Sequence, residues 1–183
     1  MTTGDAGATK GGRAPAFETE RLLLRPLTQA DAPFLVEQLN DSDFLRNIGD
    51  RGVRTLAQAR AYIENGPVAS YREHGHGLLM VELRETGDSI GTCGLIRRDF
   101  LEHVDVGFAF LRRHRRRGYA FEAASAAMDH GRRALGLDPI LAIVSSGNRA
   151  SIRLLEKLGL RFVEDRELPG GDRVLLFSTA GPG

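Results

Sequence analysis

Two segments in the second half of the chain carry residues that could do chemistry. The first is a basic turn from Arg112 to Ala120 (RRHRRRGYA), and the second is the spaced pair Asn148 and Ser151. A glycine in a basic turn that opens a helix favours phosphate oxygens, because the first N–H groups of a helix have no internal partner and lie at the positive end of its dipole. Arginine adds bidentate donors for the same oxygens. The turn therefore indicates an anion site.

Three interpretations compete for these arginines: a solvated charged face, a nucleic-acid or localisation patch, and a site for the phosphates of a cofactor. The formal net charge of the 183-residue chain is only +1. A chain with so little net charge is a poor general polyanion binder, so any attraction to phosphate must be local.

The elements around the turn would position it. Val104 to Leu111 (VDVGFAFL) is apolar enough to be a buried strand, with Gly107 as a point of bulge or close backbone approach. After the turn, apolar and small residues recur at helical spacing, which predicts an amphipathic helix. Ile140 to Val144 is predicted to lie as a strand beside 104–111, and a helix over 148–158 should end at Gly159.

The rest of the chain supplies a sheet and two helical patterns. The other predicted strands are 21–25, 78–83, 89–96, 161–168 and 173–177. Thr28 and Asp31 should begin one helix. A second helical pattern over 56–71 must break or kink at Gly66-Pro67, and 40–52 is predicted to be a polar loop.

Composition places few further limits on the chain. Hydrophobic residues make up 42% and charged residues 27%, as in an ordinary globular protein. One cysteine, Cys93, excludes an internal disulfide framework and suits a reducing compartment, and no apolar run is long enough for a membrane span. We expect a cytoplasmic protein with a disordered tail at 1–16, one domain at 17–178 and a flexible C-terminus at 179–183.

Three motifs resemble one known family. Arg115-Arg116-Arg117-Gly118-Tyr119-Ala120 resembles the acetyl-CoA pyrophosphate loop of the GNAT N-acetyltransferases, Gln/Arg-x-x-Gly-x-Gly/Ala. Asn148 to Ser151, followed by 154–160, is similar to the family's next helix in its RimJ/RimL type, the ribosomal-protein N-terminal acetyltransferases. Residues 19–27 (TERLLLRPL) are similar to the first strand of that type. The resemblance covers about residues 17–178.

The resemblance implies a single α/β domain with a mixed, mostly antiparallel sheet of about seven strands, flanked by helices and splayed between 104–111 and 140–144 to admit acetyl-CoA. It places the pyrophosphate on the amides of Arg116 to Ala120, with Arg112 or Arg115 reaching other phosphate oxygens. It also implies that Phe108, Phe110 and Asn148 lie along the pantetheine arm. From the residues alone, the two phenylalanines could be simply core and Asn148 only a helix cap.

The implied reaction is direct acetyl transfer to a primary amine, either a protein N-terminal α-amine or a small amine. By resemblance Ser151 lies close enough to the sulfur of the thioester to hydrogen-bond it or to protonate the leaving thiolate. Leu155 stands where many family members carry a tyrosine general acid, which leaves Ser151 or water for that role. Asp105 and Glu102 are candidates for the base, although both could be purely structural.

The alternative function is a catalytically degenerate domain that binds acyl-CoA, or a nucleic-acid binder that uses the arginines. We expect no metal, no membrane partner and no nucleic acid, and a homodimer stays open.

Overall fold

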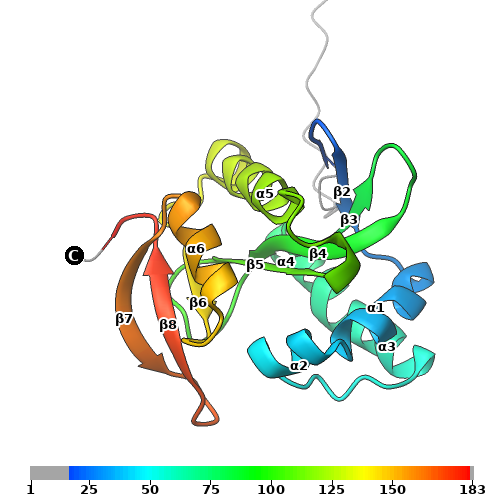
Figure 1. The fold of residues 1–183 in the computed structure, drawn as a ribbon, viewed down its shortest axis with the longest axis horizontal. Coiled ribbons are helices and arrows are strands. Elements are labelled where there is room, and N and C mark those ends of the chain that lie inside the picture. The colour runs from blue at the N-terminus through cyan, green and yellow to red at the C-terminus, as the bar shows by residue number, and fades with distance from the viewer. Residues whose placement is uncertain (1–16, 182–183) are drawn as a thin grey trace, which may run out of the picture.

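One open sheet of eight strands organises the chain, in the order β1-β2-β3-β4-β5-β6-β8-β7 (Figure 1). The computed structural model describes residues 17–181. The strands are β1 (Phe17–Glu18), β2 (Leu22–Pro26), β3 (Leu78–Leu83), β4 (Ser89–Ile96), β5 (Asp105–Phe110), β6 (Leu141–Val144), β7 (Arg161–Glu167) and β8 (Arg173–Ser178). All the predicted strands are present. The additional strand is β1, whose two residues pair with β2 and are too few to give a periodic pattern.

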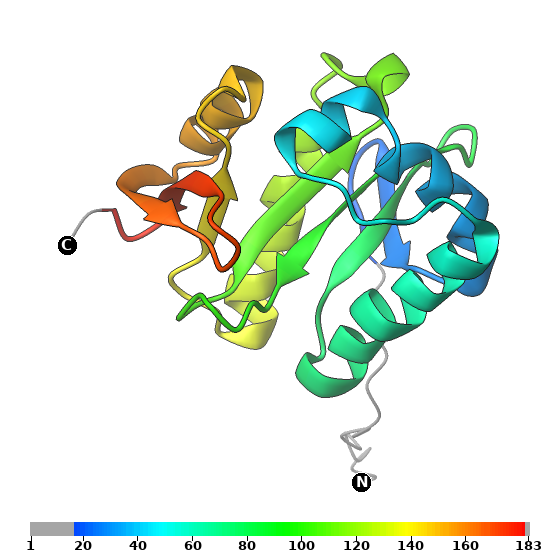
Figure 2. The same ribbon diagram turned by 90° about the horizontal axis from the view of Figure 1, so that it is seen from below.

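The sheet is antiparallel except where β5 and β6 run parallel, which confirms the predicted mixed sheet. Within the described residues, β5 and β6 pair only at Asp105 and Leu141. There the N–H of Leu141 donates to the carbonyl of Val104 at 2.9 Å. Beyond this point the β6-β8-β7 part of the sheet turns away from the β1–β5 part, as Figure 2 shows. The predicted splay is therefore confirmed.

The divergence leaves one edge of β5 without a neighbouring strand. The backbone groups of successive residues in a strand point to alternate edges. Because the carbonyl of Val104 points towards β6, the N–H and C=O groups of Val106 and Phe108 point to the same edge. These groups are available to an extended ligand.

Helices cover both faces of the sheet (Figure 1). α5 (Tyr119–Leu135) lies on one face, and the opposite face carries α1 (Ala32–Leu39), α3 (Leu56–Ile63) and α4 (Ala69–His74). α6 (Arg149–Lys157) packs beside β6. Gly131 lets α5 approach β4 closely, because a Cβ there would lie 2.4 Å from Cδ1 of Leu95. The apolar side chains on the two faces form separate core clusters.

One local prediction needs correction, and a second is confirmed in more detail. The predicted polar loop at 40–52 contains a short helix, α2 (Ser42–Asn47), because Asp41 accepts hydrogen bonds from the N–H groups of Asp43 and Phe44 and caps it. The side chain of Phe44 is buried and anchors this helix in the core. The helical pattern over 56–71 is interrupted around Gly66-Pro67 as predicted, and the interruption is a π-helical turn, η2 (Glu64–Val68), that leads into α4. Proline has no N–H to donate within the helix, and the wider π-helical turn accommodates this missing hydrogen bond and the proline ring.

The chain remains attached to the sheet after β8. The N–H of Thr179 donates to the carbonyl of Ile140, and its hydroxyl accepts from the N–H of Ile140, both at 3.0 Å. The predicted tail at 1–16 and the last two residues, 182–183, lie outside the described residues. Between residues 17 and 181 no helix is both long enough and apolar enough to cross a membrane.

Candidate active site

The basic turn between β5 and α5 presents backbone N–H groups rather than a simple row of charges. A 3-10 turn, η3 (Arg112–His114), leads to Arg116 and Gly118, whose φ values are 63° and 81°. Gly118 caps α5 in the left-handed conformation, which glycine adopts without steric cost. Within residues 17–181, the N–H groups of 116–120 donate no hydrogen bond to another residue. The turn therefore has the free donors that an anion site at a helix N-terminus requires.

The arginines of this turn divide into two groups. Arg113 pairs with Glu37, and Arg115 pairs with Asp41 and Asp43 and donates from Nε to the carbonyl of Phe110 at 2.7 Å. Arg115 thus joins α2 to the end of β5. The other three, which are exposed and form no ion pair with a described residue, are Arg112, Arg116 and Arg117.

Arg21, just before β2, contacts both the basic turn and the first turn of α5. Its Nη1 donates to the carbonyl of Arg117 at 2.9 Å, and its guanidinium lies 4.6 Å from the ring centre of Tyr119. Nε donates to Glu122 in the first turn of α5 at 2.7 Å. Glu122 also accepts from the N–H of Arg21 at 2.9 Å and from the hydroxyl of Thr19 at 2.6 Å. The sequence showed Arg21 only as part of a strand motif, so this role was missed.

The pKa of Glu122 reflects these contacts. Its partial burial raises the pKa, but the hydrogen bonds from Thr19 and Arg21 outweigh burial and lower it below the usual value for glutamate. Glu122 is therefore ionised at neutral pH, and Arg21 and the first turn of α5 are held together by opposite charges.

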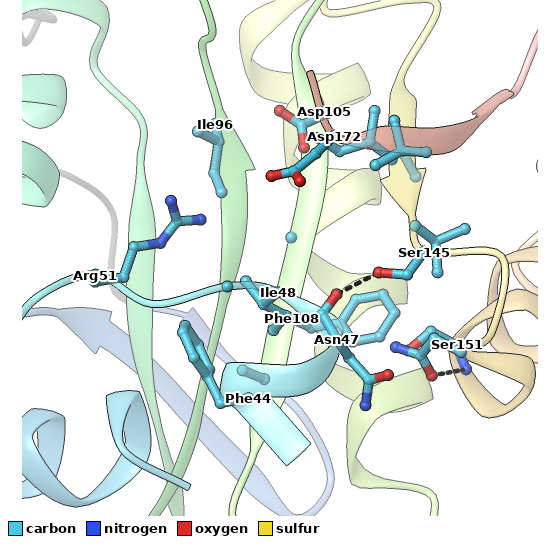
Figure 3. Close-up of a pocket in the computed structure, with 18 of the residues that line it drawn as sticks. Phe44, Asn47, Ile48, Arg51, Ile96, Asp105, Phe108, Ser145, Ser151 and Asp172 are labelled. Atoms are coloured by element: carbon cyan, nitrogen blue, oxygen red, sulfur yellow. Dashed lines mark hydrogen bonds between the residues drawn. The ribbon is translucent and has the colours of Figure 1, made fainter. Parts of the chain in front are cut away.

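A cavity of about 550 Å³ lies at the splay between β5 and β6 (Figure 3). Four of the predicted site residues line it: Asp105, Phe108, Asn148 and Ser151. Glu102 is exposed and does not line the cavity, and Phe110 is buried in the core. Apart from Glu102 and Phe110, the structure thus gathers the predicted residues into two groups, one at the cavity and one at the basic turn.

Asn148 and Ser151 form the start of α6. The Oδ1 atom of Asn148 accepts from the N–H of Ser151 at 3.2 Å, so the predicted cap is present and the side-chain NH2 is left over. Ser151 is half-buried at the cavity wall. Leu155, one turn later, also lines the cavity and is buried, so this position offers no hydroxyl.

Asp105 begins β5 and is only 1% exposed. Burial raises the pKa of its carboxyl, and Arg98, which donates from Nε to Oδ1 at 2.8 Å, opposes this shift. Gly107 lies two residues further along the same face. The β4–β5 register is unbroken there, so Gly107 is a close approach and not a bulge: a Cβ would lie 2.7 Å from Cδ1 of Ile96.

Several cavity residues were not predicted from the sequence. Ser145, at the end of β6, donates from its hydroxyl to the carbonyl of Asn47 at 2.6 Å and links β6 to α2 across the splay (Figure 3). The others that enter the argument below are Arg51, Tyr62, Arg98 and Asp172. The Asp in the turn at 169–172 and the Arg pair at 97–98 were visible in the sequence, but no local pattern says where such side chains point.

Other chemistry has little support in the described residues. Cys93 is fully buried, and burial raises the pKa of its thiol to about 12, so it is the buried small residue that was predicted. Among residues 17–181, no three His, Cys, Asp or Glu side chains gather as metal ligands.

Comparison with known proteins identifies one family over most of the chain. A family model described as "Acetyltransferase (GNAT) domain" matches residues 21–161. The chain is 33% identical over 150 residues to YoaA of Bacillus subtilis, named as an uncharacterized N-acetyltransferase, with 80% of this chain and 83% of that protein covered.

Solved structures show the same fold. An acetyltransferase from Agrobacterium tumefaciens has a TM-score of 0.74 and 29% identity, covering 90% of this chain and 93% of that one. RimL, an alpha-N-protein acetyltransferase for a ribosomal protein in complex with coenzyme A, has a TM-score of 0.77 over 90% of this chain and 97% of its own. Its identity of 13% supports likeness of fold alone.

Proposed function

The chain belongs to the GNAT acetyltransferase family, and from this premise we propose that it binds acetyl-CoA and transfers the acetyl group to a primary amine. One observation carries the proposal. The free N–H groups of the basic turn follow the end of β5, and the cavity runs along β5 from Asp105 to Ala109, where the edge of the strand is unpaired and Ser151 lines the wall.

The residues present fit acetyl-CoA. The amides of 116–120 would hold the pyrophosphate, because no Cβ at Gly118 obstructs it and three exposed arginines in the turn supply positive charge. The free backbone groups of Val106 and Phe108, with the amide of Asn148, would hold the pantetheine arm. Acetyl-CoA supplies the acetyl group as an activated thioester.

The side chains at the cavity would manage the protons. The neutral amine attacks the thioester carbonyl, a C–N bond forms and the C–S bond breaks. The amine would give up its proton to Asp105 directly or through water, and the leaving thiolate would be protonated through the hydroxyl of Ser151. Ser151 would regain a proton from solvent and Asp105 would return its proton to solvent, so both residues end the cycle unchanged. Burial raises the pKa of Asp105 towards that of an amine, which makes it a better proton acceptor than an exposed carboxylate.

An α-amine suits this arrangement better than a lysine. Its pKa of about 7.7 to 8.0, against about 10.4 for lysine, leaves a useful fraction neutral near pH 7. We therefore propose a protein N-terminus or another small α-amine as acceptor, in keeping with the RimJ/RimL resemblance, and a cytoplasmic location that agrees with the single buried thiol. The nucleic-acid alternative is not favoured, since Arg113 and Arg115 are already neutralised by acidic partners.

The test is acetyl-CoA binding by calorimetry together with a thermal melt. Saturation at 100 times the dissociation constant should stabilise the fold by about 2.7 kcal/mol. Gly118→Asp should abolish binding, because a carboxylate would face the pyrophosphate.

The matched control is Gly136→Asp at the other end of α5, where φ is also positive at 64°. A Cβ at this position would have no neighbouring atom within 4 Å. The variant introduces the same charge and the same backbone strain. Absence of acetyl-CoA binding by the wild type, or equal binding by the two folded variants, would contradict the proposal.

A further inference from the structure

The part of the cavity remote from Asn148 and Ser151 has a composition that selects among amines. It is bounded by α2 and the loop after it, by the β4–β5 turn, and by the turn between β7 and β8 (Figure 3). Ile48 and Phe100 line it and remain 41% and 37% exposed, which gives the mouth an apolar rim. Such a rim suits the aliphatic portion of a small side chain.

The charged side chains of the cavity are predominantly basic. Four arginines line it, Arg46, Arg51, Arg98 and Arg173, against two aspartates, Asp105 and Asp172. Arg46 pairs with Asp43 and Arg98 with Asp105, which leaves Arg51 and Arg173 against Asp172. A wall with this excess repels a polycation such as a polyamine and attracts an anionic group. The acceptor must nevertheless bring an amine, so the balance points to a molecule that carries both charges.

Three hydrogen-bond donors with unused capacity face this space. Arg98 uses Nε for Asp105, and its two terminal nitrogens donate to no other described residue. Arg51 is exposed and forms no ion pair within residues 17–181 (Figure 3). Tyr62 lines the same cavity, and its hydroxyl forms no hydrogen bond with a described residue. Burial raises the pKa of its phenol, and the charges of Arg51 and Arg98 oppose that shift. Guanidinium groups match the geometry of a carboxylate and bind it through paired hydrogen bonds.

Asp172 supplies the complementary charge. It lies in the turn between β7 and β8, where the N–H of Leu168 donates to its carbonyl at 2.7 Å and the N–H of Gly171 donates to the carbonyl of Leu168 at 2.9 Å. Its side chain lines the same cavity as Asp105 (Figure 3). Because Arg98 already neutralises Asp105, Asp172 is the carboxylate left to attract an ammonium group.

We propose that the acceptor is a primary amine that bears a carboxylate close to the amino group, an inference that rests on the proposed acetyl transfer. Arg51, Arg98 and Tyr62 bind the carboxylate, and Asp172 draws the ammonium group towards Asp105 before the proton is removed. A free amino acid and a peptide that begins with an acidic residue share this chemistry.

The experiment measures thiol release from acetyl-CoA with matched acceptors. One pair is a free amino acid and its amide, L-methionine and L-methioninamide, and the other is a C-terminally amidated tetrapeptide that begins with Glu or with Gln. Spermidine is the polycation. In at least one pair the acceptor that bears the carboxylate should have a kcat/KM about tenfold higher than its uncharged partner, because it gains one charged hydrogen-bonded contact. The pair that shows the difference tells whether the acceptor is a free amino acid or a peptide.

Variants assign the preference to residues. Arg51→Gln should raise the KM for the preferred acceptor about tenfold and remove most of the kcat/KM difference within the pair. Tyr62→Phe should raise the same KM about threefold. The control is Arg60→Gln on α3, which removes an equal charge from an exposed arginine that does not line the cavity. Acetyl-CoA binding is measured for every variant by calorimetry.

The outcomes separate the two proposals. Equal kcat/KM within both pairs, a preference for spermidine, no turnover of any acceptor despite acetyl-CoA binding, or an unchanged preference in Arg51→Gln would overturn the acceptor class and leave the cofactor site standing. Failure of the wild type to bind acetyl-CoA would overturn the proposed function, and the acceptor class with it.

Discussion

Two regions of the site use different kinds of hydrogen-bond donor: the basic turn, and the part of the cavity proposed to bind the acceptor, called the acceptor side here. On the basic-turn side the donors are backbone N–H groups of consecutive residues. Ion pairs such as Arg21 with Glu122 fix the position of the turn against the start of α5. On the acceptor side the donors are side chains such as Arg51 and Arg98, which come from separate connections. A site made of backbone depends on a contiguous stretch of sequence, whereas a site made of side chains can change one residue at a time. This difference suits a common cosubstrate and a variable acceptor.

The largest effect should come from the residue between the two sides. Ser151→Ala removes the hydroxyl proposed to protonate the thiolate, so kcat should fall about 100-fold, the lower end for a general acid. The dissociation constant for acetyl-CoA and the KM for the acceptor should change little. Ser146→Ala, at an exposed position outside the cavity, is the control. A loss of acetyl-CoA affinity that matches the loss of rate would instead assign Ser151 to binding.

A smaller effect should appear at the frame of the basic turn. Arg21→Ala removes the hydrogen bond to the carbonyl of Arg117 and the contact with Tyr119, so the dissociation constant for acetyl-CoA should rise about tenfold. The acceptor KM should not change. Arg84→Ala provides the comparison, because Arg84 contacts the neighbouring Thr19 carbonyl and Glu18 but not the turn. If the two variants change the dissociation constant for acetyl-CoA equally, the contacts of Arg21 with Arg117 and Tyr119 do not support cofactor binding by the turn.

The smallest effect should be on stability. The folded-state pKa of Glu122 is lowered, so its contribution is fully present above the unfolded pKa of about 4.3 and is lost as pH falls through the folded value. Glu122→Gln should lower the free energy of unfolding at pH 7 by about 0.5 to 1 kcal/mol, since Arg21 is partly exposed and screened. Urea unfolding of both proteins from pH 7 to pH 3 should show the difference shrink with acid. A constant difference would indicate a packing effect.

The local structure of the basic turn and of the helix after it agrees with the sequence prediction, for a physical reason. Its residues are neighbours in the chain, so Gly118 and the helix after it could be recognised from local pattern alone. The strands were also predictable, because their apolar runs and turns are local signals. The expected cap by Asn148 is present for the same reason.

The acceptor side could not be predicted in the same way. α2 has six residues and depends on the cap by Asp41 and the buried Phe44, so it gave no helical period. The directions of Arg51 and Asp172 follow from how distant segments meet across the splay. The pairing of Arg98 with Asp105 connects two ends of one turn and was visible only as two charges seven residues apart.

The turn between β7 and β8 has a consequence for engineering. Its backbone hydrogen bonds, from Leu168 to the carbonyl of Asp172 and from Gly171 to the carbonyl of Leu168, lie within the turn itself. The segment 168–172 therefore carries its own hydrogen bonds and can be exchanged as a unit between the two strands. If the proposed acceptor class holds, libraries confined to this segment should change acceptor choice and leave acetyl-CoA binding, which is proposed for residues far away in the chain, unchanged.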